Sequence, residues 1–271
     1  MSDVREDADN GNTAVLSSGR PSGTSCTKPE GAPLPHGAEG VQERGDEGPS
    51  PSDVCTITAS GRSYMIENPG GRVGSKVEHG EPYERKLLVD IAQHKPSGVA
   101  FDVGAHVGNH SLYLAGIVGL KVHAFECHAA TVAMLHRNVA LNPGLDITVH
   151  PLALGAEPGR GTLTAGRWIE FDPSRDDVGH VETGEGDIEV VRVDDLLDEP
   201  DLSIVKVDVE GTEPQVLQGM VRHLSRSHPI VYTEAHSPKA HAEVAEVLEP
   251  LGYRMTRGIH MGSTMERWEV R

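Results

Sequence analysis

The sequence predicts an α/β protein in which helices cover both faces of a mostly parallel sheet. From residue 85 on, short apolar runs rich in β-branched residues alternate with segments of helical periodicity, which is typical of parallel strands joined by crossover helices. The apolar runs are continuous, as expected for strands buried on both faces. Because such strands end at one common edge, we expect the ligand site at this edge.

Five apolar runs are interpreted as parallel strands, with the fourth lying beside the first. In order, they are GVAFDV (98–103), KVHAFE (121–126), ITVHPLA (147–153), SIVKVDV (203–209) and PIVYTEA (229–235). Two later runs are expected to form an antiparallel pair, namely YRMTR (253–257) and MERWEV (265–270).

Four segments around these strands are expected to be helical. RKLLVDIA (85–92) precedes the first strand. HAATVAMLHRNVALN (128–142) has apolar residues at helical spacing and is followed by a Pro-Gly stop signal. TEPQVLQGMVRHL (212–224) has a proline in its first turn, where proline is tolerated, and KAHAEVAEVLEPLGYRM (239–255) is expected to end near Gly252.

Residues 157–192 interrupt the alternation of strands and helices. They are rich in Gly, Asp and Glu and contain the strand-like pieces GTLTA and DIEVVRV. Because a helix-free connection of about 35 residues exceeds the ordinary length of a loop, we predict an inserted hairpin. A flexible segment near 172–187 is expected to act as a lid over the site.

Residues 1–54 are expected to form a disordered tail that precedes a folded domain over 55–271. The tail holds 8 Gly, 6 Pro and 7 Ser, no aromatic residue, and 10 acidic against 4 basic side chains. Such a composition buries too little apolar surface to offset the entropy cost of ordering the chain.

The charge and hydropathy of the chain argue against two classes of partner. A formal net charge of −17 over 271 residues disfavours nucleic-acid binding, because such surfaces are usually basic. The chain shows neither a secretory signal pattern nor an apolar run near the roughly 18 residues of a membrane span. We therefore expect a cytoplasmic protein with a small-molecule partner, and the oligomeric state, including a homodimer, is left open.

The turn DVGAHVG (102–108) ends the first strand and is the most informative loop. A dinucleotide-binding turn, G-x-G-x-x-G, needs its second glycine where this chain has His106 and its third where it has Asn109. The second glycine normally lets the backbone approach a pyrophosphate. The sequence therefore disfavours a dinucleotide at this turn.

The same turn suits an amino acid moiety. Gly104 permits a sharp turn, and Gly108 lets the loop pass close to a group smaller than a pyrophosphate. Asp102 supplies negative charge for an ammonium group, and the helix that begins near Asn109 offers N–H groups to a carboxylate. S-adenosylmethionine carries both groups and is the predicted cofactor.

Two further strand ends complete the expected cofactor site. Glu126 ends the second strand, where an acidic side chain accepts hydrogen bonds from both ribose hydroxyls. Leu154 follows the third strand and is expected to pack against an adenine. The predicted cofactor-binding residues are Asp102, Gly104, Ala105, His106, Gly108, Asn109, Ser111, Glu126, Cys127 and Leu154.

Several segments follow in the order and spacing of a known family. FDVGAHVGNHSLYLA, VHAFECHAATVAMLHRNVALN, VRVDDLL, LSIVKVDVEGTEPQVLQGM and PIVYTEA resemble the FkbM-type branch of the class I S-adenosylmethionine-dependent methyltransferases. The resemblance covers residues 80 to about 256, and KVDVEGTEPQVLQG is its most specific piece. This chain has His106 where the family often has asparagine and Cys127 where proline is common.

The resemblance implies a Rossmann-like, seven-stranded sheet and S-adenosylmethionine as the methyl donor. It also implies O-methylation of a hydroxyl on a sugar, polyketide or other secondary metabolite. N-methylation of a metabolite or peptide is an alternative within the family. An oxidoreductase with a nucleotide cofactor and a non-catalytic binding protein of the same fold are alternatives outside it.

The predicted catalytic residues are Asp208, Glu210 and His236. Asp208 and Glu210 end the fourth strand, and the two-residue period of a strand puts them on one side of the chain. Glu210 and Glu213 are alternatively interpreted as acids that stabilise the start of the next helix. Lys206 shares the face of Asp208 and is expected to pair with a carboxylate.

His236 follows Glu234 at the end of the fifth strand, where the two form an acid and imidazole pair. The ordinary pKa of histidine suits a general base, although a surface histidine is the alternative interpretation. His106 and His110 are four residues apart, but His106 precedes the helix and no third ligand follows at a recognised spacing. The sequence therefore predicts no metal at these two histidines. A role as substrate clamp or metal ligand is an alternative for Asp208 and Glu210, and metal dependence is left open.

Overall fold

The computed structural model describes residues 53–164, 180–261 and 264–270. Its largest sheet has seven strands in the order β12–β13–β11–β10–β3–β4–β5. The parallel strands are β3 (Val99–Val103), β4 (Lys121–Phe125), β5 (Ile147–His150), β10 (Leu202–Val207) and β11 (Ile230–Glu234). The hairpin of β12 (Tyr253–His260) and β13 (Thr264–Val270) joins β11 in antiparallel fashion. The predicted α/β class, the seven strands and the antiparallel pair are confirmed.

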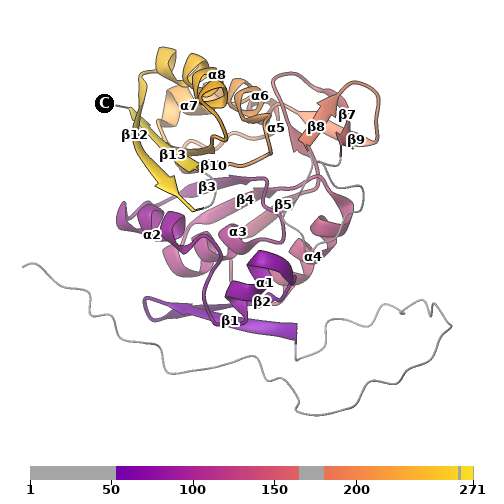
Figure 1. Ribbon diagram of the computed structural model, residues 1–271, viewed down its shortest axis with the longest axis vertical. Helices are drawn as coiled ribbons and strands as arrows, with labels where there is room; N and C mark the ends of the chain where they lie inside the picture. The colour runs from indigo at the N-terminus through magenta and orange to yellow at the C-terminus, as the bar shows by residue number, and fades with distance from the viewer. Residues whose placement is uncertain (1–52, 165–179, 262–263, 271) are drawn as a thin grey trace, which may run out of the picture.

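Helices cover both faces of this sheet (Figure 1). One face carries α2 (Arg85–Gln93), α3 (Asn109–Tyr113) with its π-helical extension (Leu114–Val118), and α4 (Ala129–Ala140). The other carries α6 (Glu213–Gln218), α7 (Val221–Ser227) and α8 (Pro238–Leu248). Phe101 and Val205 on the sheet are buried against Leu217 of α6 and Leu248 of α8 in one apolar cluster.

The start of α8 is fixed by local chemistry. Ser237 is its N-cap residue, with a side-chain oxygen that accepts a hydrogen bond from the backbone N–H of Ala240 at 3.2 Å. Pro238 occupies the first helical turn, where its missing N–H costs nothing. This cap places the short loop after β11 at the sheet edge. At the far end, Gly252 adopts φ +91°, which confirms the predicted stop.

A β-hairpin that the sequence analysis did not identify packs outside the α3 layer. It consists of β1 (Val54–Ala59) and β2 (Arg62–Glu67) and is followed by α1 (Gly71–Val77). Ile57 and Ile66 of the hairpin are fully buried in a cluster with Leu112 of α3. Because β1 begins at Val54, the ordered domain starts slightly before the predicted boundary. The rest of the predicted tail, residues 1–52, lies outside the described residues.

Two predicted elements are each divided in the structure. The run 147–153 forms β5 and, after Pro151, the separate strand β6 (Ala153–Leu154), because proline lacks the N–H that would continue the ladder. The predicted helix 212–224 breaks at Gly219 into α6 and α7. Gly219 lies so close to Gly155 that a Cβ at this position would overlap the carbonyl oxygen of Gly155.

The inserted hairpin is confirmed and belongs to a second sheet of four strands. Its order is β6–β9–β7–β8, in which β7 (Gly159–Thr164) pairs antiparallel with both β8 (His180–Thr183) and β9 (Ile188–Val191). Strand β8 falls within the segment 172–187 that was predicted to be flexible. The remainder of that segment up to residue 179 lies outside the described residues, and its role as a lid stays a prediction.

Within the part of the chain that the structure describes, no helix combines the length and apolar character needed to cross a lipid bilayer.

The packing of Gly219 predicts a large effect of a small substitution. Gly219→Ala would force α6 and the loop after β6 apart, so we expect a loss of about 1–3 kcal/mol in the free energy of unfolding. Urea denaturation monitored by circular dichroism measures this loss. Gly144→Ala is the control, because a Cβ there meets no atom within 4 Å, and its change should stay within about 0.5 kcal/mol. Equal stability of the two variants would contradict the packing.

Candidate active site

A cavity of ≈ 370 Å³ opens at the carboxyl ends of β4, β3, β10 and β11. The strand order reverses between β3 and β10, which is where open α/β sheets bind ligands. The volume lies in the range of small-molecule sites. The predicted site residues that line the cavity are Gly104, Ala105, His106, Asn109, Glu126, Cys127, Leu154, Asp208, Glu210 and His236.

Close contact between the ends of β3 and β10 shapes the turn after β3. Gly104 has φ +75°, and a Cβ there would overlap the backbone carbonyl oxygen of Asp208. Only glycine allows the backbone at residue 104 to lie this close to Asp208. The sharp turn predicted at Gly104 is confirmed. His106 follows with φ +50°, a conformation that costs energy for a residue with a Cβ.

The Lys206 ammonium group occupies the centre of the site beneath this turn. The residue is 1% exposed, and its Nζ donates a hydrogen bond to the carbonyl oxygen of Gly104 at 2.9 Å. The same Nζ lies 3.4 Å from Asp102 Oδ1 and 3.4 Å from Asp208 Oδ2. Lys206 therefore forms ion pairs with two carboxylates, where the sequence analysis expected one.

The opposite charges of Lys206 and of the carboxylates of Asp102 and Asp208 stabilise one another. Burial lowers the pKa of Lys206, but the carboxylates of Asp208 and Asp102 outweigh burial and raise it above its ordinary value. Burial raises the pKa of Asp208, yet the Lys206 charge and a hydrogen bond with Glu234 hold it below its ordinary value. The site therefore contains a permanent ammonium group and an ionised Asp208 at neutral pH.

Glu126 organises the cofactor side of the cavity. Its carboxylate accepts hydrogen bonds from the backbone N–H groups of His106, Cys127 and His128, each at 2.9 Å. Burial raises its pKa, and these hydrogen bonds oppose the rise. Oε2 accepts one of these three hydrogen bonds and Oε1 the other two, so Oε2 retains acceptor capacity toward the cavity.

His106 and Cys127 present neutral groups beside this carboxylate. Burial, followed by the Lys206 charge, lowers the pKa of His106 to about 4. Burial raises the pKa of the Cys127 thiol to about 12, with the charge of Glu126 acting in the same direction. Both side chains are therefore uncharged at neutral pH, and the cofactor side of the cavity takes its negative charge from Glu126.

Three predicted cofactor-binding residues do not line the cavity. Asp102 is fully buried, and its Oδ2 accepts a hydrogen bond from Ser111 Oγ at 2.6 Å while its Oδ1 faces Lys206. Asp102 thus contacts an ammonium group of the protein where a ligand ammonium was predicted. Gly108 is the N-cap of α3, and a Cβ there would press on Leu135 of α4. Glycine at this position therefore allows α3 to pack against α4, and the predicted approach to a ligand stays a prediction.

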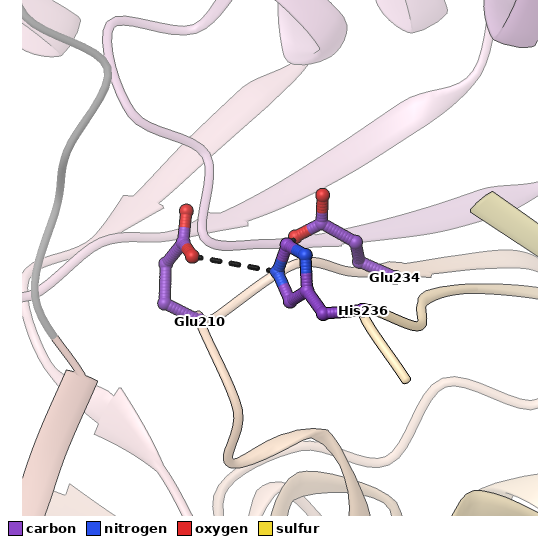
Figure 2. Close-up of side chains that lie close together, drawn as sticks. All are labelled: Glu210, Glu234 and His236. Atoms are coloured by element: carbon purple, nitrogen blue, oxygen red, sulfur yellow. Dashed lines mark ion pairs between the residues drawn. The ribbon is translucent and has the colours of Figure 1, made fainter. Parts of the chain in front are cut away.

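The predicted catalytic residues lie together at the ends of β10 and β11. Glu210 follows β10 with φ +60°, Glu234 ends β11, and His236 lies in the loop before α8. His236 Nε2 is 2.9 Å from Glu234 Oε2 and 3.5 Å from Glu210 Oε2. Figure 2 shows the imidazole between the two carboxylates. The prediction that these residues share one edge is confirmed, and their catalytic role stays a prediction.

Residues before β3 close the cavity on the α2 side. The Asn109 side chain accepts a hydrogen bond from the Tyr83 N–H and donates one to the Tyr83 carbonyl oxygen, both at 3.0 Å. Glu84 Oε2 lies 3.1 Å from His110 Nε2. All four residues line the cavity, so Asn109 acts here by holding the Tyr83 loop.

Sequence reasoning did not identify several lining residues. Arg72 reaches the cavity from α1, Met261 from the residue after β12, and Val181 from β8 of the inserted sheet. None belongs to a motif, and only the folded chain brings them together. Glu234 was noticed beside His236, and its burial at 6% exposure was not predictable from the sequence.

Comparisons with known proteins identify methyltransferases as relatives of this chain. A model of the methyltransferase FkbM domain matches residues 102–255. The chain is 31% identical over 174 residues to the hexuronic acid methyltransferase AglP of Haloferax volcanii, covering 62% of this chain and 68% of that protein. It is 29% identical over 178 residues to methyltransferase 1 of Beauveria bassiana, covering 58% of this chain and 71% of that protein.

Among solved structures, the chain is similar to the methyltransferase FkbM of Methylobacillus flagellatus KT. The sequence identity is 22% and the TM-score is 0.48, and the match covers 64% of this chain and 43% of that chain.

The buried ion pairs of Lys206 predict a pH-dependent loss of stability. Lys206→Met should lower the free energy of unfolding by about 3–5 kcal/mol at pH 7, because the fully buried Asp102 and the partly buried Asp208 lose their cation. Asp208 has a lowered pKa in the folded protein, so its contribution is complete above the unfolded value of about 4 and is lost as the pH falls through the lower folded value. The loss should therefore shrink on acidification, as urea denaturation at pH 7 and at about pH 2.5 measures.

Lys239→Met is the control for this experiment. Lys239 is 84% exposed on α8 and pairs with Glu243, so the change should stay within about 0.5 kcal/mol at both pH values. A Lys206→Met loss that is independent of pH would contradict the ion-pair explanation.

Proposed function

The chain belongs to the FkbM methyltransferase family, and on that premise we propose that it uses S-adenosylmethionine to O-methylate a hydroxyl group of a sugar-like small molecule. The observation that carries the proposal is one cavity with two different ends. Glu126 lines the end at β4, and the cluster of Asp208, Glu210 and His236 lines the end at β10 and β11.

The cofactor end of the cavity fits S-adenosylmethionine. Glu126 retains an acceptor for a ribose hydroxyl, and Leu154 offers an apolar surface to an adenine. The neutral His106 stands where a dinucleotide turn needs a glycine, which disfavours a nicotinamide cofactor and hence the oxidoreductase alternative. When bound, S-adenosylmethionine supplies a methyl group on a sulfonium and departs as the neutral thioether.

Asp208 is proposed as the proton acceptor. It lies beside the turn that contains Gly104 and is ionised at neutral pH. The hydroxyl proton becomes strongly acidic as its oxygen forms a third bond, to the methyl carbon, while the bond from that carbon to sulfur breaks, so even a carboxylate of low pKa can take the proton. Glu210 and His236 then hold the acceptor in line, and correct alignment lowers the barrier by up to about 7–11 kcal/mol.

The acceptor class is inferred from a relative and from charge. AglP, the relative from Haloferax volcanii, is named as a hexuronic acid methyltransferase, which supports a sugar acid as acceptor. A proton acceptor such as Asp208 is needed by a hydroxyl and not by a carboxylate, which is already ionised at neutral pH. A hydroxyl of such a sugar, rather than its carboxylate, is therefore proposed to react.

The proposed cofactor leads to a binding prediction. S-adenosylmethionine and S-adenosylhomocysteine should bind one per chain in isothermal titration calorimetry, and NADH and NADPH should not. Glu126→Ala should weaken binding by about 1–3 kcal/mol through the loss of charge-assisted hydrogen bonds. Glu243→Ala on exposed α8 is the control and should leave affinity unchanged. Tight binding of a nicotinamide cofactor without binding of the sulfonium would refute the proposal.

The proposed reaction leads to an activity prediction. Simple glycosides of hexuronic acids, incubated with the enzyme and S-adenosylmethionine, should gain one methyl group by mass spectrometry. The product should resist mild base, because a methyl ether is stable where a methyl ester is hydrolysed. A base-labile product would show that the carboxylate reacts, and a non-catalytic binding protein would give no product.

Asp208→Asn should reduce kcat in this assay by about 10²- to 10⁴-fold, as expected for the loss of a proton acceptor. Asp195→Asn is the control, since the Asp195 side chain is 62% exposed on α5 (Val193–Leu196). Full turnover of Asp208→Asn at saturating cofactor would mean that another group accepts the proton.

A further inference from the structure

The cluster of Glu210, Glu234 and His236 has the arrangement of metal ligands. One oxygen of each carboxylate and one nitrogen of the imidazole lie within 4.8 Å of one another. Each side chain comes from a different position at the sheet edge, yet all three point toward a common centre (Figure 2). We propose that these three side chains bind a divalent cation that holds the acceptor in the cavity, an inference that rests on the proposed function.

The spacing of the three atoms supports coordination. A first-row divalent cation binds nitrogen and oxygen ligands at about 2.1 Å, so neighbouring ligands are about 3.0 Å apart in an octahedral site and about 3.4 Å apart in a tetrahedral one. The observed distances from His236 Nε2 are 2.9 Å to Glu234 and 3.5 Å to Glu210. These distances match two edges of a coordination polyhedron.

The surroundings of Glu234 are a second, independent observation. Its side chain is 8% exposed and lines the cavity together with those of Glu210 and His236. A carboxylate buried to this extent needs a compensating positive group close by. Lys206 is already shared between Asp208 and Asp102, which favours a further cation beside Glu234.

Ligand chemistry narrows the choice of cation. Two carboxylates and one imidazole suit Mn²⁺ or Zn²⁺ better than a cation that prefers oxygen alone. His236 and Glu210 have side chains that are 48% and 38% exposed, so the remaining coordination positions face the cavity. Oxygen atoms of the acceptor are the ligands proposed for them, and Asp208 still takes the proton of the reacting hydroxyl.

The test measures metal binding on the full chain, after chelator treatment and without cofactor or acceptor. Free Mn²⁺ is followed by electron paramagnetic resonance, and Zn²⁺ and Mg²⁺ are titrated by calorimetry. We expect one Mn²⁺ or Zn²⁺ per chain, and at least about tenfold weaker binding in Glu210→Gln and in His236→Asn. Both side chains are partly exposed, so the variants should melt at the same temperature as the parent protein.

The matched control is His241→Asn. His241 is another imidazole paired with a buried carboxylate, 2.8 Å from Glu266, with a side chain that is 40% exposed. It lies outside the cavity, so its loss should leave the affinity for Mn²⁺ unchanged. Absence of saturable binding of all three cations, or equal affinity of His236→Asn and His241→Asn, would overturn the proposal.

The two proposals fail separately. If no cation binds but S-adenosylmethionine binds and the sugar is methylated, the proposal of a metal site is wrong and the proposed function stands. His236 then interacts with Glu210 and Glu234 without a metal. If a cation binds, the affinity for the acceptor is the second measurement. The acceptor should bind at least about tenfold more tightly when Mn²⁺ is present. Glu210→Gln should remove this gain and leave the affinity for S-adenosylmethionine unchanged.

Discussion

The buried ammonium group of Lys206 is the interaction on which the site depends. Lys206 on β10 is in register with Asp102 on β3, so the two side chains leave neighbouring strands on the same face. A register shift of one residue would turn Lys206 to the opposite face of the sheet and leave Asp102 without its cation. Since burying each charge costs several kcal/mol, this pairing penalises every other register.

The same ammonium group links the two halves of the site. Through the carbonyl oxygen of Gly104 it contacts the turn at the cofactor end, and through Asp208 it contacts the acceptor end. The cofactor end contains backbone groups and the neutral side chains of His106 and Cys127, with Glu126 as its carboxylate. The acceptor end contains carboxylates and an imidazole. In the proposed reaction, the sulfonium cation and the neutral hydroxyl would therefore meet different electrostatic surroundings within one cavity.

The sequence predicts those parts of the fold that depend on local signals. Continuous apolar runs identify the parallel strands, and Gly104 identifies the sharp turn, because both follow from backbone chemistry. The division of two elements at Pro151 and Gly219 depends on where other segments of the folded protein lie, which the sequence does not give. The partner of Asp102 could not be predicted for the same reason. A buried acid at a strand end looks alike in sequence whether it faces a ligand or, as here, a lysine.

The position of Glu234 explains why the acceptor end needs more than the lysine can supply. Lys206 carries one positive charge and contacts both Asp102 and Asp208, while the side chain of Glu234 is 8% exposed and contacts His236 at the same sheet edge. Glu210 Oε2 lies 3.5 Å from the same imidazole nitrogen. The proposed divalent cation would bind one atom of each of these three side chains at once. It would thereby bring to the acceptor end the positive charge that Lys206 already shares between two other carboxylates.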